Sequence, residues 1–171
     1  MVTFLAGLPQ VSRPLMANWF RQNPQTTQKS DQSPVTIADQ QTETALRDFI
    51  ATTFPDDSIQ GEEFGITGND DSPRFCWIID PIDGTKAFIS GKPIFGTLVG
   101  ITDHGVPLAG MIDMPILEET YIGHVMGQNQ PFCQLVFLFL ICFFLIQFFF
   151  LYRKLFPYIY FINFNFESNL F

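Results

Sequence analysis

The sequence predicts an α+β fold for residues 1–128, and three observations support this prediction. Apolar residues recur at three- and four-residue steps in 3–21 and again in 36–54, which is the period of an amphipathic helix. Two β-type runs, 96–102 and 106–113, are joined by the short sequence DHG, which is typical of a hairpin. We therefore expect two helices packed on an antiparallel sheet.

The remaining residues, 129–171, differ sharply in composition. Thirteen of the 21 Phe residues follow position 130. Residues 1–133 carry 16 acidic and 7 basic side chains, whereas the rest of the chain has a net charge of +1. We therefore expect two unlike pieces, a domain portion over 1–128 and a hydrophobic tail over 129–171. The acidic first piece has no basic stripe, which argues against nucleic acid as a partner.

The first helix is expected within residues 3–21. Pro9 and Pro14 should bend or split it, because proline removes a helical hydrogen bond and clashes with the preceding turn. The polar segment 23–33 that follows is rich in Gln and Thr, and we interpret it as a loop.

The second helix should begin after Pro34, which favours an extended backbone, with Thr36 as its cap. Asp39 then lies in the first helical turn. One interpretation of Asp39 is purely structural, since a carboxylate is favourable near the positive end of the helix dipole. The other interpretation is catalytic, and it depends on the resemblance given below.

A short strand at 58–60 is expected to follow, and then the sequence GEE at 61–63. Two adjacent glutamates on a loop usually form a solvated surface pair. The next segment, 65–72, is rich in turn-forming residues and predicts a connection without assigned chemistry.

The chain is organised around WIIDPIDGTKAFISG, residues 77–91. The apolar run 75–79 predicts a buried strand that leads into Asp80 and Asp83, and the composition of 86–89 predicts a short helix. Two hard oxygen ligands suit a divalent cation such as Mg²⁺, and unpaired N–H groups at a helix start suit a phosphate. The structural alternative is an Asp-Pro turn followed by an Asp cap, which leaves one of the carboxylates unexplained.

A last strand is expected at 119–125. We interpret His104, in the hairpin turn, and His124, near the last strand, as structural, because neither has a metal-ligand partner at a useful spacing. Asp113 is interpreted as a strand-end residue rather than a ligand.

Three cysteines, Cys76, Cys133 and Cys142, show no CxxC spacing and are odd in number. They indicate neither a disulfide framework nor a zinc site. A reducing, cytoplasmic setting is the default expectation. The N-terminus lacks the pattern of a secretion signal.

The string DPIDGT after an apolar strand resembles the central signature of the inositol monophosphatase superfamily, the magnesium-dependent and lithium-sensitive phosphomonoesterases. Its continuation, KAFISGKPIFGTLVGI, is most similar to the histidinol-phosphate phosphatase branch. The resemblance covers roughly residues 5–128. It implies the N-terminal half of a layered αβαβα fold.

The resemblance also implies a metal site with two Mg²⁺ ions. Glu62, Asp80 and the backbone carbonyl of Ile82 would hold one ion, and Asp80 and Asp83 would contribute to the second. In the family, a WD-type motif in a second half supplies the Asp that completes the second site. Nothing after residue 128 matches that half.

The catalytic groups implied by the resemblance are Asp39 and Thr85, which would hold and polarise the attacking water. The sequence KSDQSPVTIADQQTE around Asp39 resembles the superfamily's first motif. The implied substrate-binding set is Glu62, Asp83, Gly84 and Thr85, with the last two contributing backbone N–H groups to the phosphate.

The reaction implied is hydrolysis of a small phosphorylated metabolite. Histidinol phosphate is the first candidate, inositol monophosphate the second and a bisphosphate nucleotide the third. The hypothesis of another class is a catalytically silent, truncated or membrane-associated fragment. By analogy with the family, the protein would form a homodimer.

Residues 135–151 form an apolar run of 17 residues followed by Arg153 and Lys154. One interpretation is a membrane anchor, because a bilayer span needs about 20 apolar residues. The other interpretation is translated non-coding sequence, since Phe, Leu, Ile, Tyr and Asn dominate with almost no Ala, Gly or charge. A membrane location would follow only from the first.

Overall fold

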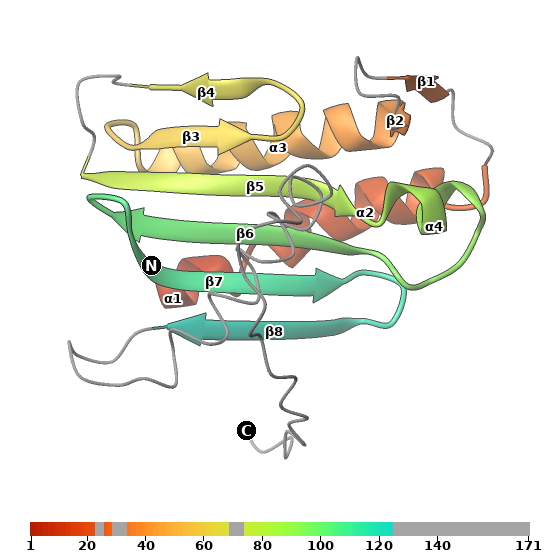
Figure 1. The fold of residues 1–171 in the computed structure, drawn as a ribbon. Coiled ribbons are helices and arrows are strands. Elements are labelled where there is room, and N and C mark those ends of the chain that lie inside the picture. Colours follow the sequence, from red (N-terminus) through yellow and green to blue (C-terminus); the bar gives the residue numbers. More distant parts are fainter. Residues whose placement is uncertain (23–25, 29–33, 69–73, 125–171) are drawn as a thin grey trace, which may run out of the picture.

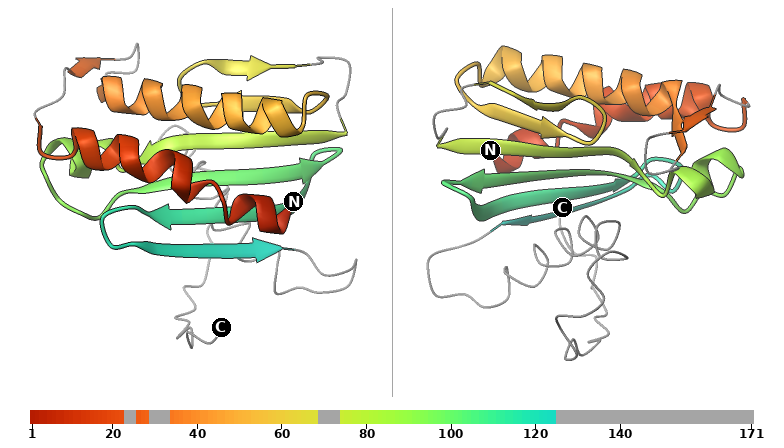
Figure 2. Two further views of the ribbon diagram at one scale, coloured as in Figure 1. Left: turned by 180° about the vertical axis from the view of Figure 1, so that it is seen from behind. Right: turned by 45° about the horizontal axis from the view of Figure 1, so that its top comes forward.

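The structure is a computed structural model that describes residues 1–22, 26–28, 34–68 and 74–124. In this part of the chain a six-stranded sheet is covered on one face by helices, which Figure 2 shows from behind and from above. The expectations for residues 129–171, including the apolar run 135–151, lie outside the described residues. None of the helices in the described ranges is both long enough and apolar enough to cross a bilayer.

The strands follow the order β4-β3-β5-β6-β7-β8 across the sheet (Figure 1). Their bounds are β3 (Ser58–Gly61), β4 (Gly65–Thr67), β5 (Phe75–Asp83), β6 (Gly96–Asp103), β7 (Val106–Met114) and β8 (Glu119–His124). The α+β class is confirmed. The sheet is mixed rather than wholly antiparallel, because β3 pairs in parallel with β5. The chain reverses into β4 before it enters β5, so β5 runs in the direction of β3.

Four helices accompany this sheet in the described part of the chain: α1 (Val2–Leu5), α2 (Pro9–Trp19), α3 (Ile37–Thr53) and α4 (Thr85–Ile89). The expected first helix is split at Pro9, which occupies the first position of α2, where a missing N–H costs no helical bond. Helix α2 continues through Pro14. Helix α3 starts directly after Thr36, as predicted.

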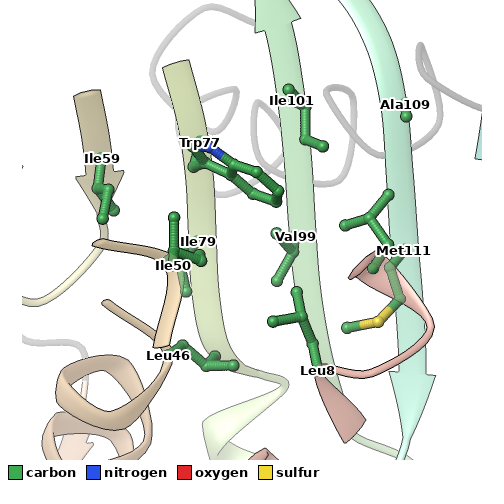
Figure 3. Packing of buried hydrophobic residues seen from close by; sticks show 11 residues of the cluster. Leu8, Leu46, Ile50, Ile59, Trp77, Ile79, Val99, Ile101, Ala109 and Met111 are labelled. Atoms are coloured by element: carbon green, nitrogen blue, oxygen red, sulfur yellow. The ribbon is translucent and has the colours of Figure 1, made fainter. Parts of the chain in front are cut away.

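The main core lies between the helices and the covered face of the sheet. Alternate residues of β5, β6 and β7 point toward the helices, as the two-residue period of a strand requires (Figure 3). This cluster contains Leu5, Leu8, Leu46, Ile50, Ile59, Trp77, Ile79, Val99, Ile101, Ala109 and Met111. It fixes α3 across β3 and β5, which brings the start of α3 near the carboxyl end of β5.

A second, smaller cluster anchors α4. Phe88 of α4 packs edge-on against Phe95, with ring centroids 4.9 Å apart, and both belong to one buried cluster with Ala38 at the start of α3. Met16 and Ile82 complete the buried set. The end of β5, the start of α4 and the start of α3 are therefore held together by apolar contacts.

Two short strands lie where the sequence predicted loops. β1 (Thr26–Gln28) lies in the predicted loop 23–33 and pairs with β2 (Pro34–Thr36). β4 lies in the predicted connection 65–72 and forms a hairpin with β3. Both strands are only three residues long, too short for a two-residue period to be visible in the sequence.

The predicted hairpin of β6 and β7 is confirmed, with His104 in its turn at a positive φ of 49°. Asp113 lies within β7, fully buried, and forms an ion pair with Arg13 of α2 at 2.7 Å. This agrees with a structural role for Asp113.

Candidate metal and phosphate site

Asp39 is placed by the start of α3. Its Oδ2 accepts hydrogen bonds from the Thr36 backbone N–H at 2.7 Å and from the Thr36 hydroxyl at 2.5 Å. The Thr36 hydroxyl in turn accepts from the N–H groups of Ala38 and Asp39, which completes a capping box. Asp39 is 1% exposed. The structural interpretation of Asp39 is thus realised. Its catalytic role stays a prediction, and the charge of Glu62, described next, also acts on this carboxylate.

Glu62 follows the last residue of β3. Its backbone N–H donates to the carbonyl of Ile79 in β5 at 3.1 Å, which places Glu62 beside the residue that precedes Asp80. Both glutamates of the sequence GEE lie in the turn after β3, as expected, whereas Gly61 is the last residue of that strand. The first glutamate, Glu62, lies next to the central strand β5. The parallel β3–β5 pair produces this proximity, because both strands end at the same edge of the sheet.

Asp80 and Asp83 lie within β5 rather than after it. The register of β5 against β6 shifts between them, so that Asp80 pairs with Leu98 and Asp83 with Gly96. The Thr97 hydroxyl donates to the carbonyl of Pro81 at 3.0 Å and holds the irregular segment. Such a bulge bends a strand and turns side chains toward a site.

The carboxylate of Asp80 is almost entirely enclosed, with 6% of the residue exposed. Its Oδ1 is buried and has no hydrogen-bond partner among the described residues. An unpaired buried carboxylate oxygen costs free energy, and a bound cation is one of the groups that would satisfy it.

The turn from β5 into α4 requires glycine at position 84. Gly84 caps the helix with a φ of 88°, in the left-handed region that disfavours a side chain. The Thr85 hydroxyl donates to the carbonyl of Ile82 at 3.1 Å. The Ile82 carbonyl and the Thr85 hydroxyl, both predicted site groups, are thus adjacent.

Burial and neighbouring negative charge raise the pKa of three carboxylates of this region, Asp39, Asp80 and Asp83. Burial raises the pKa of Asp80 well above its usual range, and the charges of Glu62 and Asp83 add to the effect, with a smaller contribution from Asp39. Burial, and then the charge of Glu62, raises the pKa of Asp83 to about 6. The pKa of Asp39 is raised chiefly by burial, with Glu62 as a minor cause. The predicted acidic residues are therefore electrostatic neighbours.

This concentration of negative charge fits a divalent cation. Carboxylate and carbonyl oxygens are the ligands of Mg²⁺ and Ca²⁺, and a cation would favour the ionised carboxylates that burial and, to a smaller extent, repulsion between charges disfavour. The carboxylates are not arranged as a preformed metal site, however. The described residues contain no group of three or more His, Cys, Asp or Glu side chains that could hold a metal ion.

The sequence profile of the inositol monophosphatase family matches residues 8–132. The chain belongs to this family. It is 45% identical over 117 residues to the "Bifunctional phosphatase IMPL2, chloroplastic" of Arabidopsis thaliana, a match that covers 68% of this chain and 34% of the plant protein. It is 42% identical over 101 residues to a histidinol-phosphatase of Chlorobaculum parvum, covering 59% of this chain and 38% of that one.

Among solved structures, the inositol monophosphatase family fold recurs in the IMPase of Thermotoga maritima, with a TM-score of 0.63 and 30% identity. That match covers 71% of this chain and 46% of the Thermotoga chain. The chain thus spans about a third of the length of the curated relatives it matches and about half of the solved ones.

Sequence reasoning missed two residues that support the site. Glu43 and Arg47 of α3 bind the loop after β3, as described below. The available signal was the i, i+4 spacing of an acidic and a basic residue one turn after Asp39. That spacing is common on solvent-exposed helices, and so it did not single them out.

Proposed function

We propose that this chain carries the N-terminal half of a Mg²⁺-dependent phosphomonoesterase site, which hydrolyses a small phosphate ester. The observation that carries the proposal is the buried Oδ1 of Asp80, which has no hydrogen-bond partner among the described residues and lies near the charges of Glu62 and Asp83. Such an arrangement is costly for a structural role alone, and it is suited to binding a divalent cation.

The proposed cation ligands are Glu62, Asp80, the Ile82 carbonyl and Asp83. Asp80 would contribute to both of the two proposed cation sites. When bound, Mg²⁺ would neutralise phosphoryl oxygens and lower the pKa of a coordinated water. The burial of Asp80 limits the access of water to its carboxylate, and the register shift of β5 lies between Asp80 and Asp83.

Asp39 and Thr85 are proposed to orient the attacking water. The Thr85 hydroxyl donates a hydrogen bond to the Ile82 carbonyl, so its oxygen can accept a hydrogen bond from that water. The raised pKa of Asp39 makes its carboxylate a better proton acceptor than an exposed one. Asp39 is in turn held by Thr36, which fixes its orientation.

The phosphate is proposed to lie at the β5–α4 turn. The N–H groups of Gly84 and Thr85 would donate to its oxygens, and the absence of a side chain at Gly84 allows close approach of the backbone. Together with Glu62 and Asp83, these residues make up the proposed substrate-binding set.

Histidinol phosphate is the substrate we propose first, because two of the most similar relatives are a histidinol-phosphatase and a bifunctional phosphatase. Inositol monophosphate is second and a bisphosphate nucleotide third. The chain spans only part of its relatives, so the groups that choose among these esters would belong to the remainder of the domain. We propose that residues 1–128 form the domain portion and that the protein is a cytoplasmic homodimer. Residues 135–151 would anchor the protein to a membrane only if they are a genuine membrane segment.

The test is phosphate release by the full chain from histidinol phosphate, inositol 1-phosphate and a nucleoside 3′,5′-bisphosphate, with Mg²⁺ and with or without Li⁺. We expect Mg²⁺-dependent, Li⁺-sensitive release that is highest with histidinol phosphate and abolished in Asp83→Asn. Metal binding without release would favour the alternative, a catalytically silent fragment. Undiminished activity of Asp83→Asn would refute the site assignment.

A further inference from the structure

The loop that carries Glu62 is clamped by a side chain from another element. Glu43 of α3 is fully buried. Its Oε2 accepts from the backbone N–H of Glu63 at 2.7 Å, and its Oε1 accepts from the N–H of Phe64 at 3.2 Å. Both amides follow Glu62 directly, so the position of Glu43 determines the path of the backbone through that residue.

Arg47 holds Glu43 in place and ties the same hairpin from its other side. Its Nε donates to Glu43 Oε1 at 2.8 Å. Its remaining nitrogens donate to the carbonyls of Ile59 and Gly65 and to the hydroxyl of Thr67, across β3 and β4. The Glu43 charge is therefore paired, and the guanidinium bridges both strands of the hairpin.

The close approach of Glu43 depends on glycine at position 61. A Cβ added to Gly61 would lie 1.8 Å from Glu43 Oε1 and 2.7 Å from the nearest Arg47 nitrogen. Gly61 thus leaves a recess in β3 that the Glu43 carboxylate fills. The recess, the Glu63 and Phe64 amides and Arg47 together form a binding site for the Glu43 carboxylate.

We propose that Glu43 is a positioning residue, which sets the affinity of the Glu62 site for a divalent cation by fixing the Glu62–Phe64 backbone. The inference rests on the proposed function only insofar as Glu62 is a ligand. Helix α3 then serves the site twice, since Asp39 lies one turn before Glu43. Groups that orient metal ligands typically change metal affinity by about 10- to 100-fold when they are removed.

The test uses the full chain and two single substitutions on α3. In Glu43→Gln, whichever way the amide is turned, its NH₂ group faces an N–H donor, because both carboxylate oxygens accept hydrogen bonds. Asp48→Asn is the matched control, since it removes a carboxylate from an exposed position of the same helix. Mn²⁺ is the probe, and its free concentration is followed by electron paramagnetic resonance.

We expect Glu43→Gln to raise the Mn²⁺ Kd by about 10- to 100-fold with unchanged stoichiometry, and Asp48→Asn to stay within twofold of wild type. A merely structural role would reduce the binding stoichiometry, as unfolded protein accumulates, without moving the Kd. A Glu43→Gln Kd within twofold of wild type would overturn the proposal. If Glu43→Gln does not fold, Glu43→Asp replaces it: this variant keeps the charge beside Arg47 but withdraws the carboxylate by one methylene, and the same Kd criteria apply.

Amide hydrogen exchange separates this proposal from the proposed function. We expect the Glu63 and Phe64 amides to be protected in wild type and Asp48→Asn, and to exchange at least tenfold faster in Glu43→Gln. If wild type binds no Mn²⁺, the metal assignment fails and the exchange rates alone decide whether Glu43 positions the loop. Unchanged protection of both amides in Glu43→Gln would overturn that role.

Discussion

The carboxylate of Asp39 closes a capping box with Thr36, with Oδ2 lying 2.7 Å from the Thr36 backbone nitrogen. One side chain therefore caps the start of α3 and interacts electrostatically with Asp80 of β5. The two roles can be separated, because a neutral amide retains most of the capping interaction while losing the charge.

We predict that Asp39→Asn lowers phosphate release at least 100-fold and reduces the free energy of unfolding by no more than about 1 kcal/mol. The asparagine carbonyl can still accept from the Thr36 N–H. Initial rates at saturating Mg²⁺ and urea titrations measure the two effects. A loss of stability with normal turnover would leave Asp39 with the capping role alone.

Removal of metal should make stability depend on pH through Asp83. The folded pKa of about 6 lies above the ordinary value of 3.8, so between these values the folded chain binds more protons than the unfolded one. The free energy of unfolding must therefore fall as pH rises through this window, and become level above it. For Asp83 alone the decrease between pH 5 and 7 is roughly 1 kcal/mol.

Urea titrations in EDTA at several pH values test this dependence. The raised pKa values of Asp80 and Asp39 act in the same direction. Asp83→Asn should have a smaller slope than wild type, whereas Asp48→Asn should not alter it. An identical slope in Asp83→Asn and wild type would mean that Asp83 titrates alike in both states.

Magnesium should stabilise the folded chain through Asp80. A ligand that binds only the folded state at 100 times its Kd adds about 2.7 kcal/mol. We expect the melting temperature to rise with Mg²⁺ in wild type and to be insensitive to Mg²⁺ in Asp80→Asn. In EDTA this variant should be no less stable than wild type, because it removes a carboxyl group whose buried Oδ1 has no hydrogen-bond partner among the described residues. Differential scanning calorimetry with K⁺ as the control ion measures this. A full Mg²⁺ response in Asp80→Asn would exclude Asp80 as a ligand.

Gly61 and Glu43 should be strongly coupled in a double-mutant cycle. Gly61→Ala places a methyl group 1.8 Å from Glu43 Oε1, so the Glu43 carboxylate must move out of the recess in β3. In a Glu43→Ala background the recess is empty, and the same substitution should cost at least 1 kcal/mol less free energy of unfolding. Additive effects in the cycle would contradict the packing of Glu43 into the Gly61 recess.

The ion pair of Arg13 with Asp113 should matter for stability and not for metal binding. Asp113 is fully buried and also accepts from the Thr120 hydroxyl at 2.7 Å. Arg13→Ala would leave this charge without its cation, at a cost of about 3 kcal/mol. The exposed pair of Arg74 with Asp103 is the control, and Arg74→Ala should leave the melting temperature nearly unchanged.

Local signals in the sequence were sufficient for most of the elements. The two β-type runs and the DHG turn predicted the β6–β7 hairpin, and Thr36 with Asp39 predicted the start of α3. These features depend on residues close in sequence, whose preferences act before any tertiary contact forms. The string DPIDGT likewise contains all of the candidate ligands except Glu62, because these ligands are near neighbours in the chain.

By itself, then, the sequence determined the α+β class, the residue types at the candidate site and the family resemblance. Only the tertiary structure decided that β3 pairs in parallel with β5, which brings Glu62 near Asp80. It also decided that Glu43 binds the backbone of the loop that follows Glu62. It also decided the raised pKa values of the carboxylates. The physical reason is that parallel pairing, burial and repulsion between charges depend on residues distant in sequence, and no local pattern records which distant residues will meet.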